Sequence, residues 1–214
     1  MAEYELYCFA QSGNAYRAAL MLNLIGADWE PRFVDFFNAM VQRQAPFREE
    51  VNEMGEAPVL VHGQKKLSQS GVILTYLSDL TGKFKPQGED ERLEALRWII
   101  FDNQKLGGNL GPYRFFRNFA KPAGHPAVLE LLKGRAEGAL AILDKRLSRG
   151  PFVLGSEPTI ADVSLTSYFY YPSEEFGFEI AAQHKNIAGW LDRMKALSGW
   201  AHPYDLMPGH PLPQ

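Results

Sequence analysis

Strand and helix patterns of hydrophobic residues both occur up to residue 80 of this chain, and only helix patterns follow, which limits the folds open to it. Residues 3–9 alternate apolar and polar side chains, the period of two that is typical of a β-strand. Apolar side chains then recur at helical spacing from Ala15 to Ile25, and Gly26 can end that helix in the left-handed conformation. The chain is therefore predicted to begin with a strand, a short loop and a helix.

Similar strand and helix signals continue up to residue 80. Gly63-Gln64 is a turn signal between two short segments and predicts an antiparallel hairpin, and Ser70 is predicted to cap the helix that follows. Further strands are predicted at residues 32–37, 59–62 and 66–68, and further helices at 40–51 and 70–80. This order predicts a small α/β layer over residues 1–81, with parallel pairing first and antiparallel pairing afterwards.

Beyond this layer the chain shows only helical spacing. Residues 81–90 are polar, contain Gly and Pro, and are predicted to be a linker. No strand alternation follows, so residues 90–200 are predicted to form an all-helical domain, with helices at 91–104, 126–147, 159–171 and 186–197. Residues 201–214 are predicted to form an irregular Pro-rich tail that frays, or else folds over a pocket with Tyr204 and Met207.

Composition excludes several classes of partner. The 214 residues carry a formal net charge of -3, which gives no overall basic field for nucleic acid or an anionic membrane surface. No signal segment and no run of about 18 apolar residues is visible, so we expect a cytoplasmic protein without a membrane segment. A single cysteine, Cys8, allows no intrachain disulfide, and the five histidines lack metal-ligand spacing, so no metal is expected.

Pro58 stands directly before the apolar segment at 59–62, although proline has no N–H to give to a sheet. An ordinary trans proline at the start of an edge strand has the larger base rate, because only about 5–6% of X–Pro bonds in folded proteins are cis. A cis bond would instead reverse the chain and leave the N–H and C=O of Ala57 open to an added peptide strand.

Four segments together resemble the glutathione transferase family. They are Ser12-Gly13-Asn14, Glu56-Ala57-Pro58-Val59-Leu60, Gln69-Ser70-Gly71-Val72-Ile73 and Thr159-Ile160-Ala161-Asp162, in this order and at the family's spacing. The resemblance covers nearly the whole chain and is to the cytosolic, bacterial-type, serine-like members. It implies the glutathione transferase fold, an α/β thioredoxin-like N-terminal domain (βαβαββα) followed by an all-α C-terminal domain. It also implies a homodimer, a role in detoxification and glutathione as co-substrate.

The resemblance implies a cis Ala57-Pro58 bond and a binding site for glutathione around it. Ala57 would pair with the peptide backbone of glutathione, and the start of the helix at Ser70 would receive the γ-glutamyl carboxylate. Gln69 would accept from the ammonium group, while the alternative role of Ser70 is that of an N-cap alone.

One position in this site departs from the family. Glu56 stands where many relatives carry Lys or Gln, which places in question a charge contact with the glycyl carboxylate. Arg17 or Lys66 could compensate.

The loop at Ser12 carries the predicted chemistry. Lowering a thiol pKa from about 8.5 to about 6.5 requires about 2.7 kcal/mol of thiolate stabilisation. A hydrogen bond to a charged acceptor supplies about 1.5–3 kcal/mol and a helix N-terminus about 0.3–1 kcal/mol, so no base is needed. By the resemblance Ser12 Oγ is the donor to the glutathione sulfur and Asn14 a second candidate, each with a plain N-cap as its alternative. Tyr7 is the rival donor, and Cys8 is read as a small buried hydrophobe.

An electrophile pocket is predicted at Tyr113, Phe116 and Arg117, which supply aromatic faces and positive charge, although ordinary core and surface is the commoner role of such clusters. Thr159 and Asp162 match a capping box, whose role is to start a buried helix. The predicted function is conjugation of glutathione to small hydrophobic electrophiles. Two alternatives are a glutathione-dependent disulfide reductase and a non-catalytic glutathione-binding or scaffold protein.

Overall fold

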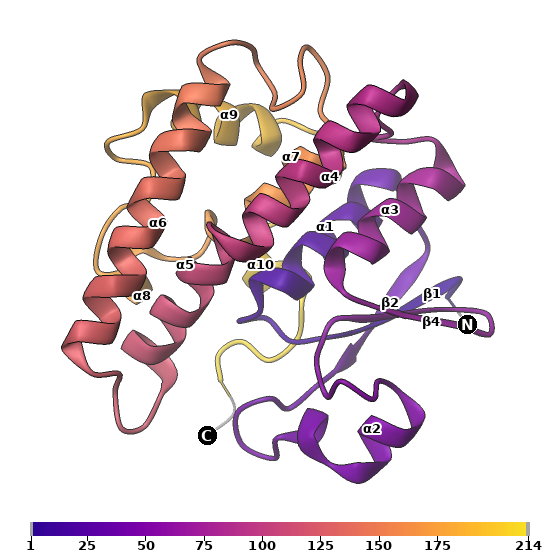
Figure 1. Ribbon diagram of the computed structural model, residues 1–214. Helices are drawn as coiled ribbons and strands as arrows, with labels where there is room; N and C mark the ends of the chain where they lie inside the picture. Colours follow the sequence, from indigo (N-terminus) through magenta and orange to yellow (C-terminus); the bar gives the residue numbers. More distant parts are fainter. Residues whose placement is uncertain (1, 213–214) are drawn as a thin grey trace. The chain divides into compact units, whose positions relative to one another are not determined.

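Four short strands form one mixed sheet in the computed structural model, which describes residues 2–212 (Figure 1). The strand order is β2-β1-β3-β4; β1 and β2 are parallel, and the other two pairs are antiparallel. Leu6 and Leu60 lie opposite each other in β1 and β3, and both are fully buried. The strands are β1 (Tyr4–Cys8), β2 (Trp29–Phe33), β3 (Val59–His62) and β4 (Lys65–Ser68).

Two helices, α1 and α3, pack against each other on the same side of this sheet (Figure 1). As predicted, α1 ends at Gly26, which has a φ of 71° and whose N–H satisfies carbonyl groups of the last turn. The helices before residue 84 and the one after residue 196 are α1 (Gly13–Ile25), η1 (Val41–Arg43), α2 (Ala45–Glu50), α3 (Ser70–Thr81) and α10 (Pro203–Leu206).

The predicted second strand at residues 32–37 is wrong in its position. The observed β2 is Trp29–Phe33, which pairs in parallel with Tyr4–Cys8. Pro31 is tolerated inside β2 because an edge strand hydrogen-bonds to a neighbour on one side only. Residues 34–37 leave the sheet instead, and Val34, with Phe36 and Phe37 packed around it, joins a hydrophobic cluster.

The chain divides into two compact units. Unit 1 extends up to Lys83 and also contains the segment from Leu197 onward, and unit 2 is Phe84–Ala196. The C-terminal segment is not the frayed, irregular tail that the sequence predicted: it contains α10, and Tyr16 Oη donates to the carbonyl of Ala201 at 3.0 Å. The part of this prediction that concerns residues 213 and 214 lies outside the described residues.

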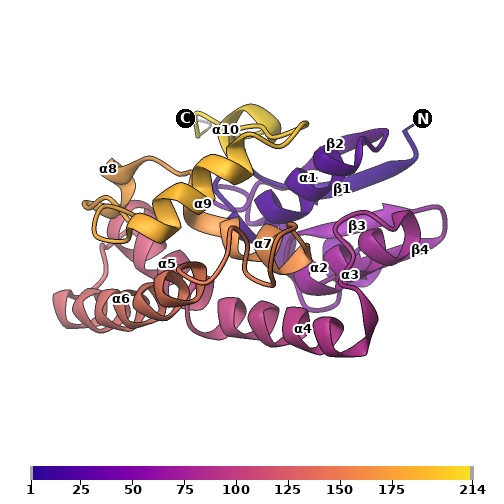
Figure 2. The same ribbon diagram turned by 90° about the horizontal axis from the view of Figure 1, so that it is seen from above.

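Unit 2 is helical, as predicted, and the two units together confirm the predicted fold class. In Figure 2, α7 lies between α4 and α9, and all six of its residues are buried. None of the helices described in residues 2–212 combines the length and the apolar character needed to cross a membrane. The elements are α4 (Gly88–Gln104), α5 (Gly107–Arg114), η2 (Phe115–Phe119), α6 (Pro126–Leu147), α7 (Ile160–Leu165), η3 (Thr166–Tyr168), α8 (Ser173–Phe176) and α9 (Lys185–Lys195).

The capping box at the start of α7 is confirmed. Thr159 Oγ1 accepts from the N–H of Ala161, and Asp162 Oδ2 accepts from the N–H of Thr159 at 2.9 Å. Asp162 does more than close a box, because its Oδ1 also accepts from the N–H of Val153 at 2.9 Å and from Trp190 Nε1 at 3.0 Å. This one buried carboxylate therefore joins α7, the segment before it, and α9.

The first turn of α9 is capped from another helix. Its own N-cap residue, His184, makes no side-chain capping bond, whereas Asp144 of α6 accepts from the backbone N–H groups of Asn186 at 2.9 Å and Ile187 at 3.2 Å. Partial burial raises the pKa of Asp144, but the hydrogen bonds from Asn186 and Ile187 outweigh it and hold the pKa below its usual value.

We expect Asp144→Ala to lower the free energy of unfolding at pH 7 by about 0.5–2 kcal/mol, the range for a lost helix cap. Because the folded-state pKa is depressed, this contribution is present above the unfolded pKa and is lost as pH falls through the folded one. Chemical denaturation at a series of pH values checks this. The difference between wild type and variant should shrink towards acid pH, and a difference that does not change with pH would contradict the assignment.

Candidate functional site

Ser12 is the N-cap of α1. Its Oγ accepts from the N–H of Ala15 at 3.1 Å, and the residue is 8% exposed. No residue within 2–212 accepts a hydrogen bond from the Ser12 hydroxyl, so its proton remains available to a ligand. Capping and donation use different parts of one hydroxyl group, and the two roles considered for Ser12 are compatible.

Asn14 follows in the first turn of α1 and is exposed. The side-chain Oδ1 of Asn14 accepts from Arg17 Nη2. Its backbone N–H has no acceptor in the described part of the chain and is one of the free donors at the start of α1. Arg17 is only 1% exposed, and Lys66 Nζ donates to the carbonyl of Glu50. Both cations considered as compensation for Glu56 are thus engaged inside unit 1.

Tyr7, the rival donor, lies in β1 opposite Val59. Its ring packs edge-on against Phe47, with the ring centroids 5.9 Å apart, and belongs to the cluster around Phe9. Tyr7 therefore has a packing role whether or not its hydroxyl reaches a ligand.

Cys8 is fully buried in β1, and desolvation by that burial raises the pKa of its thiol to about 12. The thiol is protonated at neutral pH and cannot act as a nucleophile there. We expect no alkylation of the native protein by iodoacetamide and one modification after denaturation, as measured by intact mass. Rapid labelling of the native protein would contradict this assignment.

The turn before β3 holds the second part of the site. The Ala57-Pro58 peptide bond is cis, as the resemblance implied. Asn52 Nδ2 donates to the carbonyl of Glu56 at 2.9 Å and fixes the turn. Among the residues described, none hydrogen-bonds to the backbone N–H or C=O of Ala57, so both groups are open to a peptide.

The start of α3 differs from the prediction, because the N-cap is Gln69 and not Ser70. Gln69 has a φ of 65°, a value that a non-glycine residue rarely adopts, and Ser70 is the first helical residue. Gln69 Nε2 donates to Glu56 Oε2 at 3.0 Å, which ties the helix start to the Pro58 turn and uses the side chain for something other than capping.

This helix start is open to an anion. The N–H groups of Val72 and Ile73 both bond to the carbonyl of Gln69. By contrast, the N–H groups of Ser70 and Gly71 have no acceptor within residues 2–212, and no side chain caps the helix. A twelve-residue helix with two free N–H groups at its positive end favours a negatively charged group.

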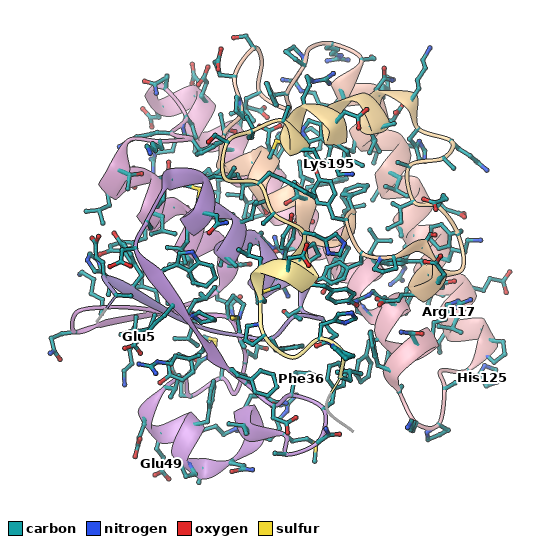
Figure 3. All side chains as sticks on the ribbon, turned by 180° about the vertical axis from the view of Figure 1, so that it is seen from behind. Glu5, Phe36, Glu49, Arg117, His125 and Lys195 are labelled. Carbon is teal, nitrogen blue, oxygen red and sulfur yellow. The ribbon has the colours of Figure 1, made fainter. Side chains whose placement is uncertain are left out.

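Of the three residues of the predicted electrophile pocket, Tyr113 and Arg117 hydrogen-bond to α8 in unit 2, whereas the ring of Phe116 packs against Phe115. Tyr113 Oη donates to the carbonyl of Phe176 at 3.1 Å, and Arg117 Nη1 donates to the carbonyl of Glu174 at 3.3 Å. Figure 3 shows Arg117 at the edge of this unit, and Phe116 is 37% exposed. The polar ends of Tyr113 and Arg117 therefore hold α8.

The same segment, residues 113–117, also contains a buried arginine that was not among the predicted pocket residues. Arg114 is 2% exposed, forms an ion pair with Glu175 and lies over the ring of Tyr171 at 3.9 Å. The only sequence feature that marks Arg114 is its position in a segment rich in aromatic residues. Within residues 2–212 no group of three or more His, Cys, Asp or Glu side chains could hold a metal ion.

Comparison with known proteins gives two family matches. The glutathione S-transferase N-terminal domain matches residues 2–79, and a glutathione S-transferase C-terminal domain matches residues 126–193. Among solved structures, a glutathione S-transferase from Xanthobacter autotrophicus Py2 is 29% identical, with a TM-score of 0.84 over 96% of this chain and 97% of that one.

Two further relatives bear on the chemistry. A glutathione transferase from Burkholderia graminis, with two glutathione molecules bound per subunit, is 25% identical, with a TM-score of 0.78 over 91% of this chain and 84% of that one. The disulfide-bond oxidoreductase YfcG of Escherichia coli is 29% identical over 75% of this chain and 76% of its own length.

Proposed function

Because this chain belongs to the glutathione S-transferase family, we propose that it binds glutathione in unit 1, stabilises the thiolate and conjugates it to small hydrophobic electrophiles. Glutathione is the co-substrate, in keeping with the glutathione bound by the relative from Burkholderia graminis. The reaction forms a carbon–sulfur bond at the electrophile as the leaving group departs or a double bond takes up the electron pair.

The observation that carries this proposal is the uncapped start of α3. Its two free N–H groups, on Ser70 and Gly71, receive the γ-glutamyl carboxylate. The neighbouring pair of Gln69 and Glu56 supplies amide and carboxylate oxygens for the ammonium group of the same glutamyl residue. The γ-glutamyl end of glutathione carries one negative and one positive group. The free N–H groups of α3 suit the negative group, and the oxygens of Gln69 and Glu56 beside them suit the positive group.

The free backbone groups of Ala57 receive the middle of the peptide. A short extended peptide adds to the open backbone with its N–H and C=O, as an extra strand does at a sheet edge. In this binding mode Ala57 hydrogen-bonds to the peptide backbone of glutathione, and the thiol side chain is directed away from these hydrogen bonds.

Thiolate stabilisation is assigned to Ser12, with Asn14 as the second donor, which makes this a serine-type member of the family. The Ser12 hydroxyl proton and the backbone N–H of Asn14 both lie at the positive end of α1. A charge-assisted hydrogen bond of about 1.5–3 kcal/mol and a helix end of about 0.3–1 kcal/mol together lower a thiol pKa by about two units. No side chain has to act as a base.

The acceptor for the thiolate is a small apolar electrophile bound with the help of Tyr113, Phe116 and Arg117. Phe116 offers an exposed aromatic face, and the guanidinium of Arg117 offers positive charge to a leaving group. Because an apolar pocket discriminates weakly between electrophiles, several substrates of this class are expected.

A homodimer in the cytoplasm is part of the same proposal. Leu93, Leu96 and Ile100 are 52%, 50% and 46% exposed, and their spacing places them on one face of α4. An exposed apolar stripe on a helix marks a surface for association. Sedimentation velocity tests this, and a monomer at micromolar concentration would exclude it. The single buried cysteine suits a reducing compartment.

The test of the function is binding of glutathione by calorimetry, followed by titration of the thiolate absorbance of bound glutathione. We expect saturable binding and a bound-thiol pKa about two units below that of free glutathione. S-methylglutathione, which has no thiol, should bind without the absorbance change. Absence of binding, or binding with an unshifted thiol, would overturn the proposal and favour a non-catalytic role.

The similarity to the disulfide-bond oxidoreductase YfcG supports a second candidate, reduction of disulfides by bound glutathione. The thiolate would attack one sulfur of the substrate disulfide and release the other as a thiol, which leaves a mixed disulfide. A second glutathione would then attack the glutathione sulfur of this mixed disulfide, form glutathione disulfide and release the second substrate thiol. Cys8 takes no part because it is buried and protonated. Turnover of a model disulfide without turnover of an aromatic halide would select this activity.

A further inference from the structure

The C-terminal segment makes two hydrogen bonds to the loop that carries Ser12. The backbone N–H of Ala10 donates to the carbonyl of Pro208 at 2.8 Å. Gln11 Nε2 donates to the carbonyl of Gly209 at 2.7 Å. Both bonds join residues almost two hundred positions apart in the sequence, and both end on the two residues directly before Ser12.

The C-terminal segment contacts α1 at several points before it reaches the Ser12 loop. A side chain at Gly199 would place its Cβ 2.6 Å from the carbonyl oxygen of Asn23, so this backbone approaches α1 closely. Tyr16 Oη then donates to the carbonyl of Ala201, and Met207 is 4% exposed. The path therefore follows α1 from its last turns back to its N-terminus.

The residues around Gly209, at the end of this segment, are also held in place by packing. Gly209 has a φ of +93°, and a Cβ there would lie 2.5 Å from the ring of Phe33, so only glycine fits without strain. The rings of Tyr204 and His210 stack at 3.6 Å with an angle of 3° between them. Figure 3 shows the chain after α10 passing beside the region of Phe36.

These contacts constrain where Ser12 can lie. Ala10 is fully buried and Gln11 is 5% exposed, so neither can exchange its partner for water without movement of the loop. On the other side, the N–H of Ser12 donates to the carbonyl of Phe9 at 3.1 Å, and its Oγ is held by Ala15. The loop is thus fixed to α1 by its own bonds and to the chain end by the two described above.

We propose that the chain end, through Pro208 and Gly209, is a positioning element that holds Ser12 in place for thiolate stabilisation. The inference rests on the proposed function. The side chain through which it acts is Gln11, a positioning residue by virtue of its bond to the carbonyl of Gly209. Small displacements of a donor weaken a hydrogen bond to a charged acceptor strongly, so the effect falls on the thiolate more than on binding.

The experiment compares Gln11→Met with wild type. Met has a similar length and volume but no donor, so the bond to Gly209 is lost. The control for the same substitution at a surface position is Gln87→Met in unit 2, where Gln87 Nε2 makes a local, exposed bond to the carbonyl of Lys85 at 2.9 Å. Gly209→Ala is a second variant, which disturbs the packing of the chain end against Phe33 and changes no residue of the Ser12 loop.

For Gln11→Met and Gly209→Ala we expect the pKa of bound glutathione to rise by about one unit, from about 6.5 to about 7.5, which reduces the thiolate fraction and kcat/KM at pH 7 about threefold. At pH values above the thiol pKa the variants should approach wild type, a pH dependence that general loss of folded protein would not produce. Gln87→Met should match wild type throughout. An unchanged bound-thiol pKa in both variants would overturn the proposal.

Hydrogen–deuterium exchange separates this inference from the proposed function. Amides of residues 10–15 should exchange faster in Gln11→Met than in Gln87→Met, without any glutathione present. If wild type binds glutathione with a shifted thiol pKa but both readouts are unchanged in Gln11→Met, the positioning role is wrong and the function stands. If wild type does not bind glutathione, the function fails and exchange alone decides whether the chain end holds the loop.

Discussion

Replacement of Asp162 by alanine is expected to lower the free energy of unfolding by about 3–5 kcal/mol, at the upper end of what single substitutions do. The carboxylate accepts from the N–H of Val153, the N–H of Thr159 and the indole N–H of Trp190, at distances of 2.9–3.0 Å. Alanine would leave all three donors buried without an acceptor. Each such group costs about 1–3 kcal/mol, less whatever local relaxation returns.

The measurement is denaturant unfolding followed by tryptophan fluorescence, with Trp190 as an internal reporter of the Asp162 contact. Asp192→Ala is the matched control, because Asp192 is an exposed acid of α9, and its effect should stay within about 0.5 kcal/mol. Asp162→Asn should cost less than Asp162→Ala, since it keeps one acceptor oxygen. Glutathione affinity measured on the folded variant should not change. A large loss of turnover at an unchanged melting temperature would show that the role of Asp162 is not structural.

Elements with strong periodicity and clear end signals could be predicted from the sequence. The helix at 126–147 and the strand at 59–62 were predicted with their observed bounds, because apolar spacing and flanking Pro or Gly mark both ends. In contrast, α5 was missed. Gly107, Gly111 and Pro112 have low helix propensity, yet α5 forms, and Gly111 is needed there because a Cβ at this position would lie 2.5 Å from Tyr168 Oη.

The candidate site likewise contains features that could be predicted from the sequence and features that could not. The cis bond at Pro58 followed from the family resemblance, because the base rate of X–Pro bonds favours trans. Ser12 could be placed as a candidate N-cap because its residue type suits a helix start. The left-handed conformation of Gln69 could not, because nothing in the residue type favours it and the tertiary bond to Glu56 accompanies it. The bonds from the chain end to the Ser12 loop end on backbone carbonyls, which carry no sequence signal at all.

Removal of the Ser12 hydroxyl is expected to raise the pKa of bound glutathione by about 1–2 units and, through the smaller thiolate fraction, to lower kcat/KM at pH 7 by about 3- to 25-fold. The change to use is Ser12→Gly, because glycine at an N-cap costs only a few tenths of a kcal/mol relative to serine. Ser12→Ala removes the same hydroxyl but also costs about 1 kcal/mol through the lost cap to Ala15. Agreement between the two variants in bound-thiol pKa, despite different melting temperatures, would separate thiolate stabilisation from helix capping.

Two controls decide which hydroxyl is responsible. Ser12→Thr keeps both the cap and the donor and should retain a lowered thiol pKa. Tyr7→Phe removes the rival hydroxyl, while the ring that packs against Phe47 remains. A loss in Tyr7→Phe but not in Ser12→Gly would transfer the role to Tyr7. The pH profile completes the test: because the thiolate is the reactive form, the deficit of Ser12→Gly should disappear above the pKa of the free thiol, where a donor is no longer needed to ionise it.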